Sequence, residues 1–563
     1  MGASNMSDVV AEGSNLFNHP DTRHQISGYP ATPKPDQQKR FRGLGSTYAT
    51  LLIGVVIGVL SFIGFFGLDR ALGTDPVYQW PAGDQAQHIA GAFAYLDADW
   101  GFPLFKTDRI NAPEGVNIIF TDSAPFAGLI AKIVYSLTGI RFNYLGSWFA
   151  VLWVGQAAGG AFLATQMGFR HPLVAASMAV IALAWPAFLN RHFHLALGSH
   201  FLLLFALGFY LKTIRAPERA STAISWSLLL GVALWTHAYL FLMSFALFVA
   251  AYGDVLLQRR LRAGKAAATV ACVSAWCAAL ALAGGYQTAG TINAVGYGSF
   301  QLDLLAFVWP HGSALWEAPV IFSAESAFEG FNYLGAGGLL CLLVGVFLVR
   351  KPHLRTLMHH PLFVLCVLGM LAFAITNNVT YAGRQLLHFD LPVQTFPFST
   401  FRASGRFGWL FGYVLVFGFF ALIIQSLWPR SRRLAVAAAV SIAALQAYDA
   451  RQLLHGMQTG WTAKPLTELE STVSRSTFVR FWPPIDCLPE GQSKTAAIEA
   501  LAVVARAGKS TNGAHIARGA KHDCSGTLPQ DAPGTLTITP AALPADDARC
   551  VRDELLRFCM SGG

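Results

Sequence analysis

A polar stretch after the first apolar run of the chain carries the residues best suited to chemistry. It reads YQWPAGDQAQHIAGAFAYLDAD from Tyr78 to Asp99. Gly83 precedes a helical pattern in which Asp84 and His88 are four residues apart and share one helix face. Asp84 lies in the first turn, where the helix dipole favours an ionised carboxylate. Such a carboxylate can act as a general base or hold a divalent metal, and the alternative is a simple N-terminal cap.

The same segment has an apolar stripe at helical spacing, formed by Ile89, Phe93, Leu96 and Trp100. It is too short and too polar to span a membrane, so we expect it to lie in the plane of the membrane interface. A second helix is predicted from Asp122 onward, in TDSAPFAGLIAKIVYSL. Counting it as a span would place most basic residues of the later loops outside, so we interpret it as juxtamembrane or re-entrant.

Two arginines could bind the phosphate of a lipid-linked donor. In FPFSTFRASGRFGW, Arg402 and Arg406 are four residues apart at the predicted outer start of a span. Ser399 or Thr400 could cap this helix. Free N–H groups, the positive helix end and two guanidinium groups would form a phosphate site. The alternative is that both arginines extend to the lipid headgroups.

Histidines near the predicted outer ends of the spans are further candidates. His192, His194 and His200 in NRHFHLALGSH invite a metal interpretation, but their spacing matches no regular metal motif, so we assign no metal ligands. His237 is predicted to lie at the tip of a helical hairpin and to line a pocket or contact phosphate.

A sugar could be held by polar residues in EGFNYLG, namely Glu329, Asn332 and Tyr333. Carboxylates, amides and phenols hydrogen bond to hydroxyl groups. Helix capping is the alternative explanation for these residues.

The elements that must position these residues are membrane helices. The chain is 54% hydrophobic and 13% charged, with a mean hydropathy of +0.44, whereas soluble chains have about 25% charged residues. Apolar runs long enough to cross a hydrocarbon core of about 30 Å recur up to residue 448. We predict eleven spans, at residues 48–68, 143–168, 172–190, 195–213, 223–236, 238–257, 266–286, 332–349, 361–377, 407–428 and 434–448.

The distribution of charge predicts the topology. Basic residues gather in the predicted inside segments, whereas residues 287–330 contain no Lys or Arg. This rule also favours two short helices at 223–257, turning at His237, over one long helix. The N-terminus is then inside and the C-terminus outside, and the first outside loop, residues 69–142, carries many carboxylates. No Asp, Glu, Lys or Arg falls near the middle of a predicted span, which disfavours an ion-coupled transporter. The net charge of +9 is explained by the Lys and Arg of the predicted cytoplasmic segments, so we expect no nucleic-acid partner.

Three domains are predicted: a disordered cytoplasmic tail at 1–47, a transmembrane domain at 48–448 and a C-terminal domain at 449–563. In the last, TAAIEALAVVARAG indicates a helix ended by Gly508, and GTLTIT indicates a strand, so we expect a small α/β unit. Its four cysteines suggest two disulfides in an oxidising compartment. The simplest of three connectivities pairs Cys487 with Cys524 and Cys550 with Cys559, and four free thiols are the alternative.

The chain resembles GT-C glycosyltransferases, and more closely an uncharacterised family of bacterial multi-spanning proteins grouped with them. The resemblance rests on GDQAQHIAGAFAYLDADWGFPL, VNIIFTDSAPFAGLIAK, FNYLGSWF, LALGSHFLLL, WTHAYLFLM, EGFNYLGAGGL and STFRASGRFGW. It implies an inverting transfer from a sugar on a lipid phosphate, with a catalytic carboxylate in the first outside loop. On this resemblance Asp84 is the candidate base. Gly-Asp-Gln stands where many GT-C enzymes have two acids, which puts a two-carboxylate metal site in doubt.

The sequence therefore predicts an all-α polytopic membrane protein of GT-C type with a small extracytoplasmic α/β domain, located in the bacterial inner membrane. We expect transfer of a sugar from a polyprenyl-phosphate donor to an extracytoplasmic glycan, lipid or protein. No cofactor is required, although a divalent metal is compatible with the reaction. The alternatives are a lipid-linked sugar flippase or transporter and a non-catalytic membrane scaffold.

Overall fold

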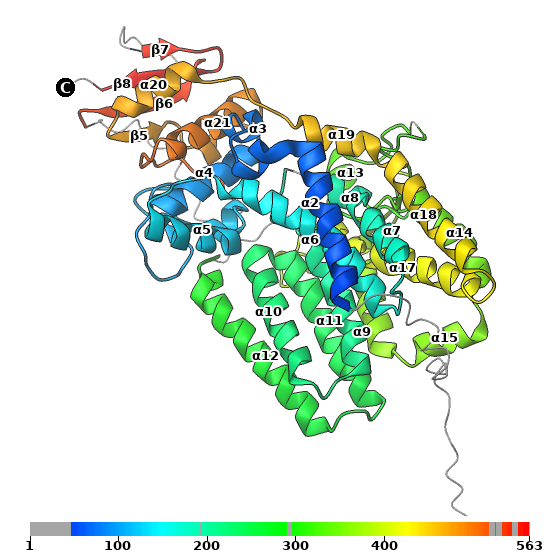
Figure 1. The fold of residues 1–563 in the computed structure, drawn as a ribbon. Coiled ribbons are helices and arrows are strands. Elements are labelled where there is room, and N and C mark those ends of the chain that lie inside the picture. Colours follow the sequence, from blue (N-terminus) through cyan, green and yellow to red (C-terminus); the bar gives the residue numbers. More distant parts are fainter. Residues whose placement is uncertain are drawn as a thin grey trace, which may run out of the picture. The chain divides into compact units, whose positions relative to one another are not determined.

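Helices form most of the structure, and strands gather near the C-terminus (Figure 1). The computed structural model describes residues 47–191, 193–289, 296–316, 318–516, 524, 532–542 and 550–561. All of these belong to one unit, Phe41–Gly563. The predicted N-terminal tail lies outside the described residues, apart from Thr47.

The first half of the chain comprises α2 (Thr47–Leu72), α3 (Pro76–Gln79), α4 (Asp84–Asp97), β1 (Lys106–Thr107), β2 (Val116–Asn117), η1 (Ile118–Thr121), α5 (Pro125–Thr138), α6 (Tyr144–Gln166), α7 (Pro172–Leu183), α8 (Pro186–Leu189), α9 (Phe201–Arg215), α10 (Ala220–Thr236), α11 (Ala238–Leu257), α12 (Ala263–Gly284) and η2 (Tyr286–Ala289). The second half comprises α13 (Ala324–Glu329), α14 (Gly335–Leu348), α15 (Lys351–Met358), α16 (Pro361–Ile375), β3 (Asn378–Tyr381), β4 (Arg384–His388), η3 (Ser404–Phe407), α17 (Gly408–Leu427), α18 (Arg432–Asp449), α19 (Arg451–Thr459), α20 (Thr467–Arg475), β5 (Phe478–Phe481), η4 (Ile485–Cys487), α21 (Gln492–Arg506), β6 (Thr535–Pro540), β7 (Cys550–Arg552) and β8 (Leu556–Met560).

A helix lies in each of the eleven predicted spans, but not all of these helices are long. Within the described residues, five stretches are long and apolar enough to cross a membrane: Tyr48–Gln79, Tyr144–Gln166, Ala238–Leu257, Ala263–Gly284 and Ser404–Leu427. The pair α14 and α15, bent by 104°, would make a sixth. The predicted span at 172–190 is broken, because α7 ends at Leu183 and Pro186 starts the short helix α8. The structure thus contains five or six candidate spans, and the count of eleven crossings stays a prediction.

Glycines allow α2 to pack closely on α6. A Cβ atom at Gly54 would lie 2.7 Å from the carbonyl oxygen of Ala157, and one at Gly58 would lie 2.7 Å from Cα of Val154. Small residues four apart permit this approach of two membrane helices. Other side chains of α2 are exposed and apolar, as suits a helix that faces lipid, and they include Leu52, Leu60, Leu68 and Leu72.

The predicted turn between α10 and α11 is confirmed. His237 has an extended backbone, with φ −162° and ψ 130°, between the last residue of α10 and the first of α11. Arg260, just after α11, donates to the carbonyl oxygen of Ile214, at the end of α9 and shortly before α10. The start of α10 and the end of α11 therefore lie close together. One continuous helix would have separated them by roughly 55 Å.

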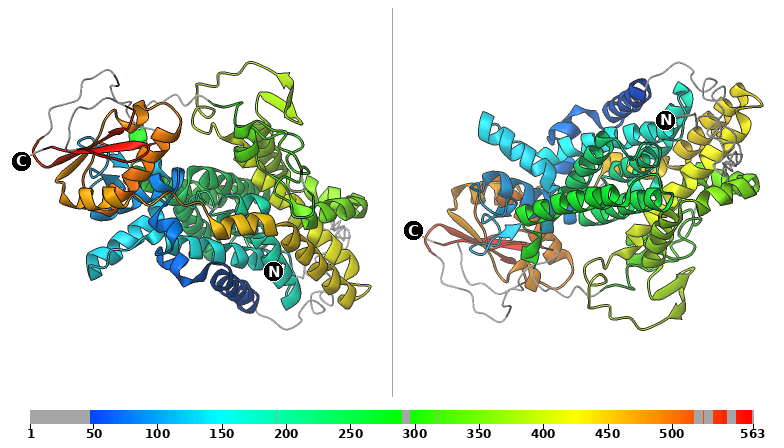
Figure 2. Two further views of the ribbon diagram at one scale, coloured as in Figure 1. Left: turned by 90° about the horizontal axis from the view of Figure 1, so that it is seen from above. Right: turned by 90° about the horizontal axis from the view of Figure 1, so that it is seen from below.

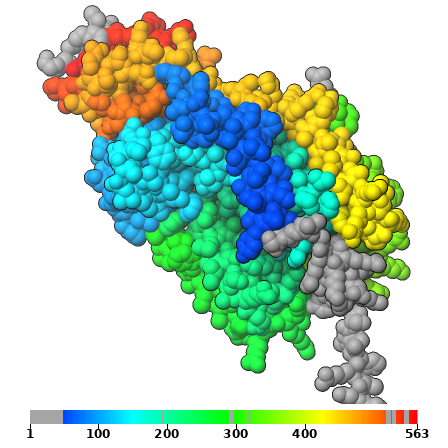
Figure 3. All heavy atoms as spheres, viewed as in Figure 1, coloured from blue at the N-terminus to red at the C-terminus, as the bar shows by residue number. Residues whose placement is uncertain are grey.

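Helix α4 is buried on all sides, which corrects the prediction of an interfacial helix. Every residue from Gln85 to Leu96 is buried, and α4 packs against α21, α5 and η1. Ile89, Phe93 and Leu96 of the apolar stripe therefore contact protein instead of lipid, whereas Trp100, beyond the end of α4, is exposed. Figures 2 and 3 show the orange C-terminal segments against the blue segments of the first predicted loop. The segment predicted as a separate C-terminal domain thus belongs to the same unit as the helices.

The C-terminal segment contains the expected small α/β arrangement. Its four strands follow the order β5-β6-β8-β7, with β5 parallel to β6 and the other neighbours antiparallel. The predicted helix is α21 and the predicted strand is β6. Disulfides join Cys487 to Cys524 and Cys550 to Cys559, and the second links the neighbouring strands β7 and β8.

Candidate functional site

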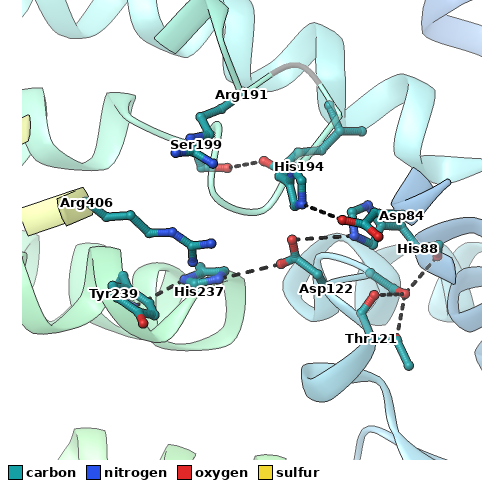
Figure 4. Close-up of polar contacts among 12 residues, drawn as sticks. Asp84, His88, Thr121, Asp122, Arg191, His194, Ser199, His237, Tyr239 and Arg406 are labelled. Carbon is teal, nitrogen blue, oxygen red and sulfur yellow. Dashed lines mark hydrogen bonds and ion pairs between the residues drawn. The ribbon is translucent and has the colours of Figure 1, made fainter. Parts of the chain in front are cut away.

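Polar side chains from helix α4 and from three connecting segments meet at the candidate site (Figure 4). Asp84 and His88 lie in the first turns of α4, and Asp122 lies between η1 and α5. His194 lies between α8 and α9, and His237 joins α10 to α11. We call these five residues the His–Asp cluster. Asp84, His88 and His237 were expected from the sequence at a site, and the structure brings them together with two further residues.

The start of α4 directs Asp84 into the cluster. Gly83 is the N-cap residue and has φ +54°, a conformation that glycine adopts without strain. Its N–H donates to Oε1 of Glu499 in α21, at 3.3 Å. Asp84 is therefore not the cap of this helix, which removes the cap-only alternative. Its side chain is 59% exposed, so a ligand could reach the carboxylate.

Asp122 is held in a strained loop. Its φ is +55° and that of Ala124 is +48°, both in the left-handed region that non-glycine residues rarely occupy. The Ser123 hydroxyl donates to the carbonyl oxygen of His88 at 2.8 Å, and the Tyr144 hydroxyl donates to that of Ser123 at 2.6 Å. Strain of this kind persists where surrounding contacts fix the chain, and it concentrates at functional sites.

Two imidazoles flank the Asp122 carboxylate. Nε2 of His88 lies 3.7 Å from one carboxylate oxygen, and Nε2 of His237 lies 3.7 Å from the other. Burial raises the pKa of Asp122 to about 6. Burial also holds the pKa of His88 below its usual value and that of His237 well below it. Both rings are therefore neutral at pH 7 and can offer a nitrogen lone pair.

Asp84 differs from Asp122 although both are aspartates. Oδ2 of Asp84 lies 3.4 Å from Nε2 of His194, and the hydrogen bond between these side chains lowers the pKa of Asp84 to about 2, although partial burial opposes the shift. The His194 ring packs edge-on against that of His88, with centroids 5.3 Å apart. Asp84 is thus an ionised carboxylate at the accessible edge of the cluster, whereas Asp122 is 19% exposed.

Three members of the cluster could hold a divalent metal ion. One ligand atom from each of His88, Asp122 and His194 lies within 4.8 Å of the other two. Two ligands that each lie about 2.1 Å from one Zn²⁺ ion are at most about 4.2 Å apart, so the contact between His88 and Asp122 already fits. Nδ1 of His194 is buried and has no hydrogen-bond partner among the described residues. Imidazole and carboxylate ligands together suit zinc and similar divalent ions.

Of the three histidines considered together in the sequence, His194 and His200 lie in different surroundings. His192 lies outside the described residues. His200 is fully buried, its Nδ1 lies 3.0 Å from the Tyr413 hydroxyl, and its ring centroid lies 4.3 Å from that of Trp409. His200 therefore belongs to the core. His194 instead meets His88 and Asp122, which come from other segments.

A buried charge triad borders the cluster. Glu329 accepts from Nε of Arg406 at 2.7 Å and from Nη2 at 2.5 Å, and it lies 3.0 Å from Nη1 of Arg191. Arg191 is 1% exposed, and Cζ of Arg406 lies 4.9 Å from the centroid of the Tyr239 ring. Burial alone would raise the pKa of Glu329, but Arg406 and Arg191 hold it far below its usual value. This carboxylate is a poor base.

The two predicted phosphate-binding arginines have different surroundings. The Arg406 guanidinium is engaged by Glu329, whereas Arg402 is exposed and its Cζ lies 5.4 Å from the Phe300 ring centroid. The candidate span Ser404–Leu427 starts with the short helix η3, which begins at Ser404 after Arg402 and has no side-chain cap. The predicted cap at Ser399 or Thr400 is therefore wrong, and the arginines do not share one helix start.

Asn332 and Tyr333 support the fold, which corrects their predicted contact with sugar. Asn332 is 2% exposed, and its amide donates to the carbonyl oxygens of Gly330 at 3.1 Å and Gly405 at 3.0 Å. Tyr333 is 1% exposed, and its hydroxyl donates to Asp449 at 3.0 Å. Glu329, the third predicted residue, belongs to the charge triad.

Sequence patterns did not identify Asp122, His194 and Arg191 as parts of one site. Asp122 stands in FTDSAPF, directly before a helix that begins with proline, and this placement was its only local signal. His194 and Arg191 lie in a loop without regular structure, and their partners are distant in the chain.

A protein-family model described as Domain of unknown function (DUF6311) matches residues 55–451. No curated protein matches the chain. Among solved structures, the crystal structure of the Archaeoglobus fulgidus oligosaccharyltransferase complex with Zn and sulfate is similar with a TM-score of 0.44 and 13% identity. The match covers 83% of this chain and 62% of the archaeal chain. At this TM-score the likeness establishes neither a shared topology nor an activity.

Proposed function

This chain belongs to the DUF6311 family, and we propose that it is a membrane glycosyltransferase of GT-C type. It would move a sugar from a polyprenyl-phosphate donor to a glycan, lipid or protein outside the cytoplasm. The observation that carries the proposal is the His–Asp cluster, in which two aspartates of unlike environment and three histidines meet at the ends of apolar helices. The resemblance of the sequence to GT-C enzymes implies the same reaction.

Asp84 is the proposed catalytic residue. Its carboxylate would accept the proton of the acceptor hydroxyl while the acceptor oxygen bonds to the anomeric carbon. The bond from that carbon to the phosphate oxygen breaks, the phosphate leaves with the electron pair, and attack from the opposite face inverts the centre. A carboxylate of low pKa is a weak base. Glycosyl transfer passes through an oxocarbenium-like transition state, so a weak base that orients the hydroxyl and takes its proton late is sufficient.

The neighbouring residues would bind and orient the leaving group. His88, Asp122 and His194 would hold a divalent metal ion, which neutralises negative charge on a phosphate when it is bound. His237 would orient Asp122 through its 3.7 Å contact. In the charge triad, two arginines face one glutamate, which leaves one net positive charge beside the cluster. This charge, together with the exposed Arg402, would attract the lipid phosphate.

The predicted topology belongs to the same proposal. Eleven crossings would place the N-terminus in the cytoplasm and the His–Asp cluster on the outer side of a bacterial inner membrane. The C-terminal segment would lie on the same side, where an oxidising compartment suits its two disulfides.

Mass spectrometry of envelope glycans tests the proposal. Cells that lack the protein should lose a sugar from one glycan, and the wild-type chain should restore it. Asp84→Asn should insert normally but restore little, because loss of a general base costs about 10²- to 10⁴-fold in rate. Glu114→Gln, an exposed carboxylate of the same predicted loop, is the matched control and should restore the glycan fully. Full restoration by Asp84→Asn would exclude its catalytic role, and an unchanged glycan profile in the deleted cells would favour a scaffold.

A further inference from the structure

A cavity lies at the opposite end of α4 from Asp84. Its volume is about 800 Å³, and it is lined by the last residues of α4, by α5 and by the residues that follow α21. Helix α4 has 14 residues, which separates the two ends by about 20 Å. No residue of the His–Asp cluster lines this cavity.

Hydrogen bonds from Arg141 hold one wall of the cavity together. Nε and Nη2 of Arg141 donate to the two carboxylate oxygens of Asp97, at 2.8 and 2.7 Å. The same guanidinium donates to the carbonyl oxygens of Arg506 at 2.8 Å and Ala505 at 3.1 Å, at the end of α21. The end of α4 is therefore fastened to the C-terminal segment, and these charged groups are already engaged.

Trp100 presents a fixed aromatic ring to the cavity. Trp100 is 50% exposed, and its indole N–H donates to Oγ of Ser136 at 3.1 Å. The ammonium group of Lys132 lies 5.0 Å from the Trp100 ring centroid and donates to the main-chain oxygen of Asp99 at 3.2 Å. The indole N–H is thus satisfied, and the residue remains half exposed where it lines the cavity.

A carboxylate and a guanidinium group line the same cavity as this ring, those of Asp99 and Arg109. Within the described residues, no hydrogen bond or ion pair engages the carboxylate of Asp99, the guanidinium of Arg109 or the hydroxyl of Tyr135, and all three residues line the cavity. A phosphate or other anion in this cavity would be repelled by the Asp99 carboxylate, which disfavours an anionic ligand. A sugar hydroxyl both donates and accepts hydrogen bonds, so it can bind a carboxylate and a guanidinium together.

We propose that this cavity binds a short, uncharged oligosaccharide. The apolar face of one sugar ring would lie on Trp100, and its hydroxyl groups would hydrogen bond to Asp99, Arg109 and Tyr135. The volume lies within the range of small-ligand pockets, which is about 300 to 1,000 Å³. The proposal concerns binding at a site remote from Asp84, so it does not rest on the transfer reaction.

A glycan array probed with the purified full-length protein in detergent tests the proposal. The wild-type chain should bind at least one neutral oligosaccharide. Trp100→Ala should weaken this binding, whereas Trp100→Phe, which keeps an aromatic ring, should largely retain it. Arg109→Gln should weaken it about tenfold or more, as expected for loss of a hydrogen bond from a charged group. Trp461→Ala and Lys106→Gln alter exposed residues outside the cavity lining and should bind as the wild type does.

Other outcomes would overturn the proposal. These are an array on which the wild-type protein binds no neutral oligosaccharide, or equal binding by the wild type, Trp100→Ala and Arg109→Gln. Nanodiscs containing phosphatidylglycerol or phosphatidylcholine provide a second comparison. Retention of phosphatidylglycerol that Arg109→Gln abolishes, without oligosaccharide binding, would identify a lipid headgroup site instead. Asp84→Asn should bind the oligosaccharide normally, which separates this site from transfer at the His–Asp cluster.

Discussion

Replacing Glu329 with glutamine should destabilise the protein strongly. The Glu329 side chain is 13% exposed, and it lies between Arg406, 11% exposed, and Arg191, 1% exposed. The amide of glutamine has nearly the same shape but no charge. Two guanidinium groups would then lie close together without a compensating anion, which is costly in a buried site.

The magnitude follows from the geometry of the triad. Unit charges 3.0 Å apart attract by about 5 to 6 kcal/mol at an effective dielectric constant of about 20. Removing one partner from a buried ion pair costs about 3 to 5 kcal/mol. The amide oxygen of glutamine still accepts one hydrogen bond, so we expect about 3 kcal/mol for Glu329→Gln. Removing Arg406 as well, in Glu329→Gln/Arg406→Gln, should cost less than the sum of the two single changes, because these residues are in contact.

The loss of stability is measured by heating the purified protein in detergent and determining, by size-exclusion chromatography, the fraction that remains folded at each temperature. Glu325→Gln is the matched control, since Glu325 is exposed in the same short helix, and it should change stability by less than about 0.5 kcal/mol. The Glu329 pKa is held below its usual value, so its stabilisation is present above the ordinary glutamate pKa and is lost as the pH falls. The difference from the wild type should therefore shrink on acidification. Identical melting of Glu329→Gln and the wild type at pH 7 would contradict the buried triad.

Three further predictions concern the metal, the disulfides and the topology. Asp122→Asn should lower the zinc or manganese content of the purified protein, measured by mass spectrometry, and an unchanged content would exclude Asp122 as a ligand. Cys487→Ser should lower the free energy of unfolding by about 4 kcal/mol in the chain-entropy model, because Cys487 and Cys524 are 37 residues apart. The C-terminal segment should then be cut faster by protease, and equal resistance of the variant and the wild type would refute this. With the four free cysteines of the described chain replaced, a cysteine at Gln385 should react with a membrane-impermeant thiol reagent and one at Gly264 should not. The reverse pattern would invert the predicted sides of the membrane.

The helices could be predicted well from the sequence because apolar runs and their flanking charges act locally. A helix lies in each expected range, and the turn at His237 follows from the excess of basic residues after α11. The C-terminal helix α21 and strand β6 were also recognisable from local pattern. These features depend on residues within one element or immediately beside it.

The surroundings of α4 could not be predicted in the same way. An apolar stripe shows that one side of a helix is buried, but not what covers it. Here α21, about 400 residues later in the chain, covers α4, and further contacts come from α5, η1, α6 and β1. Membrane lipid and a distant protein segment select for the same apolar residues, so Ile89 and Phe93 could not distinguish them.

The contacts within the His–Asp cluster could not be predicted from the sequence either. Asp84 and Asp122 have identical side chains, and no local spacing predicts that His194 contacts one while His88 and His237 flank the other. The difference in environment raises the pKa of Asp122 to about 6 and lowers that of Asp84 to about 2. It also leaves Asp84 accessible and Asp122 enclosed. In the proposed reaction the more exposed Asp84 would meet the substrate hydroxyl, whereas the less exposed Asp122 would act through its neighbours, and Asp84→Asn and Asp122→Asn are designed to separate these two proposed roles.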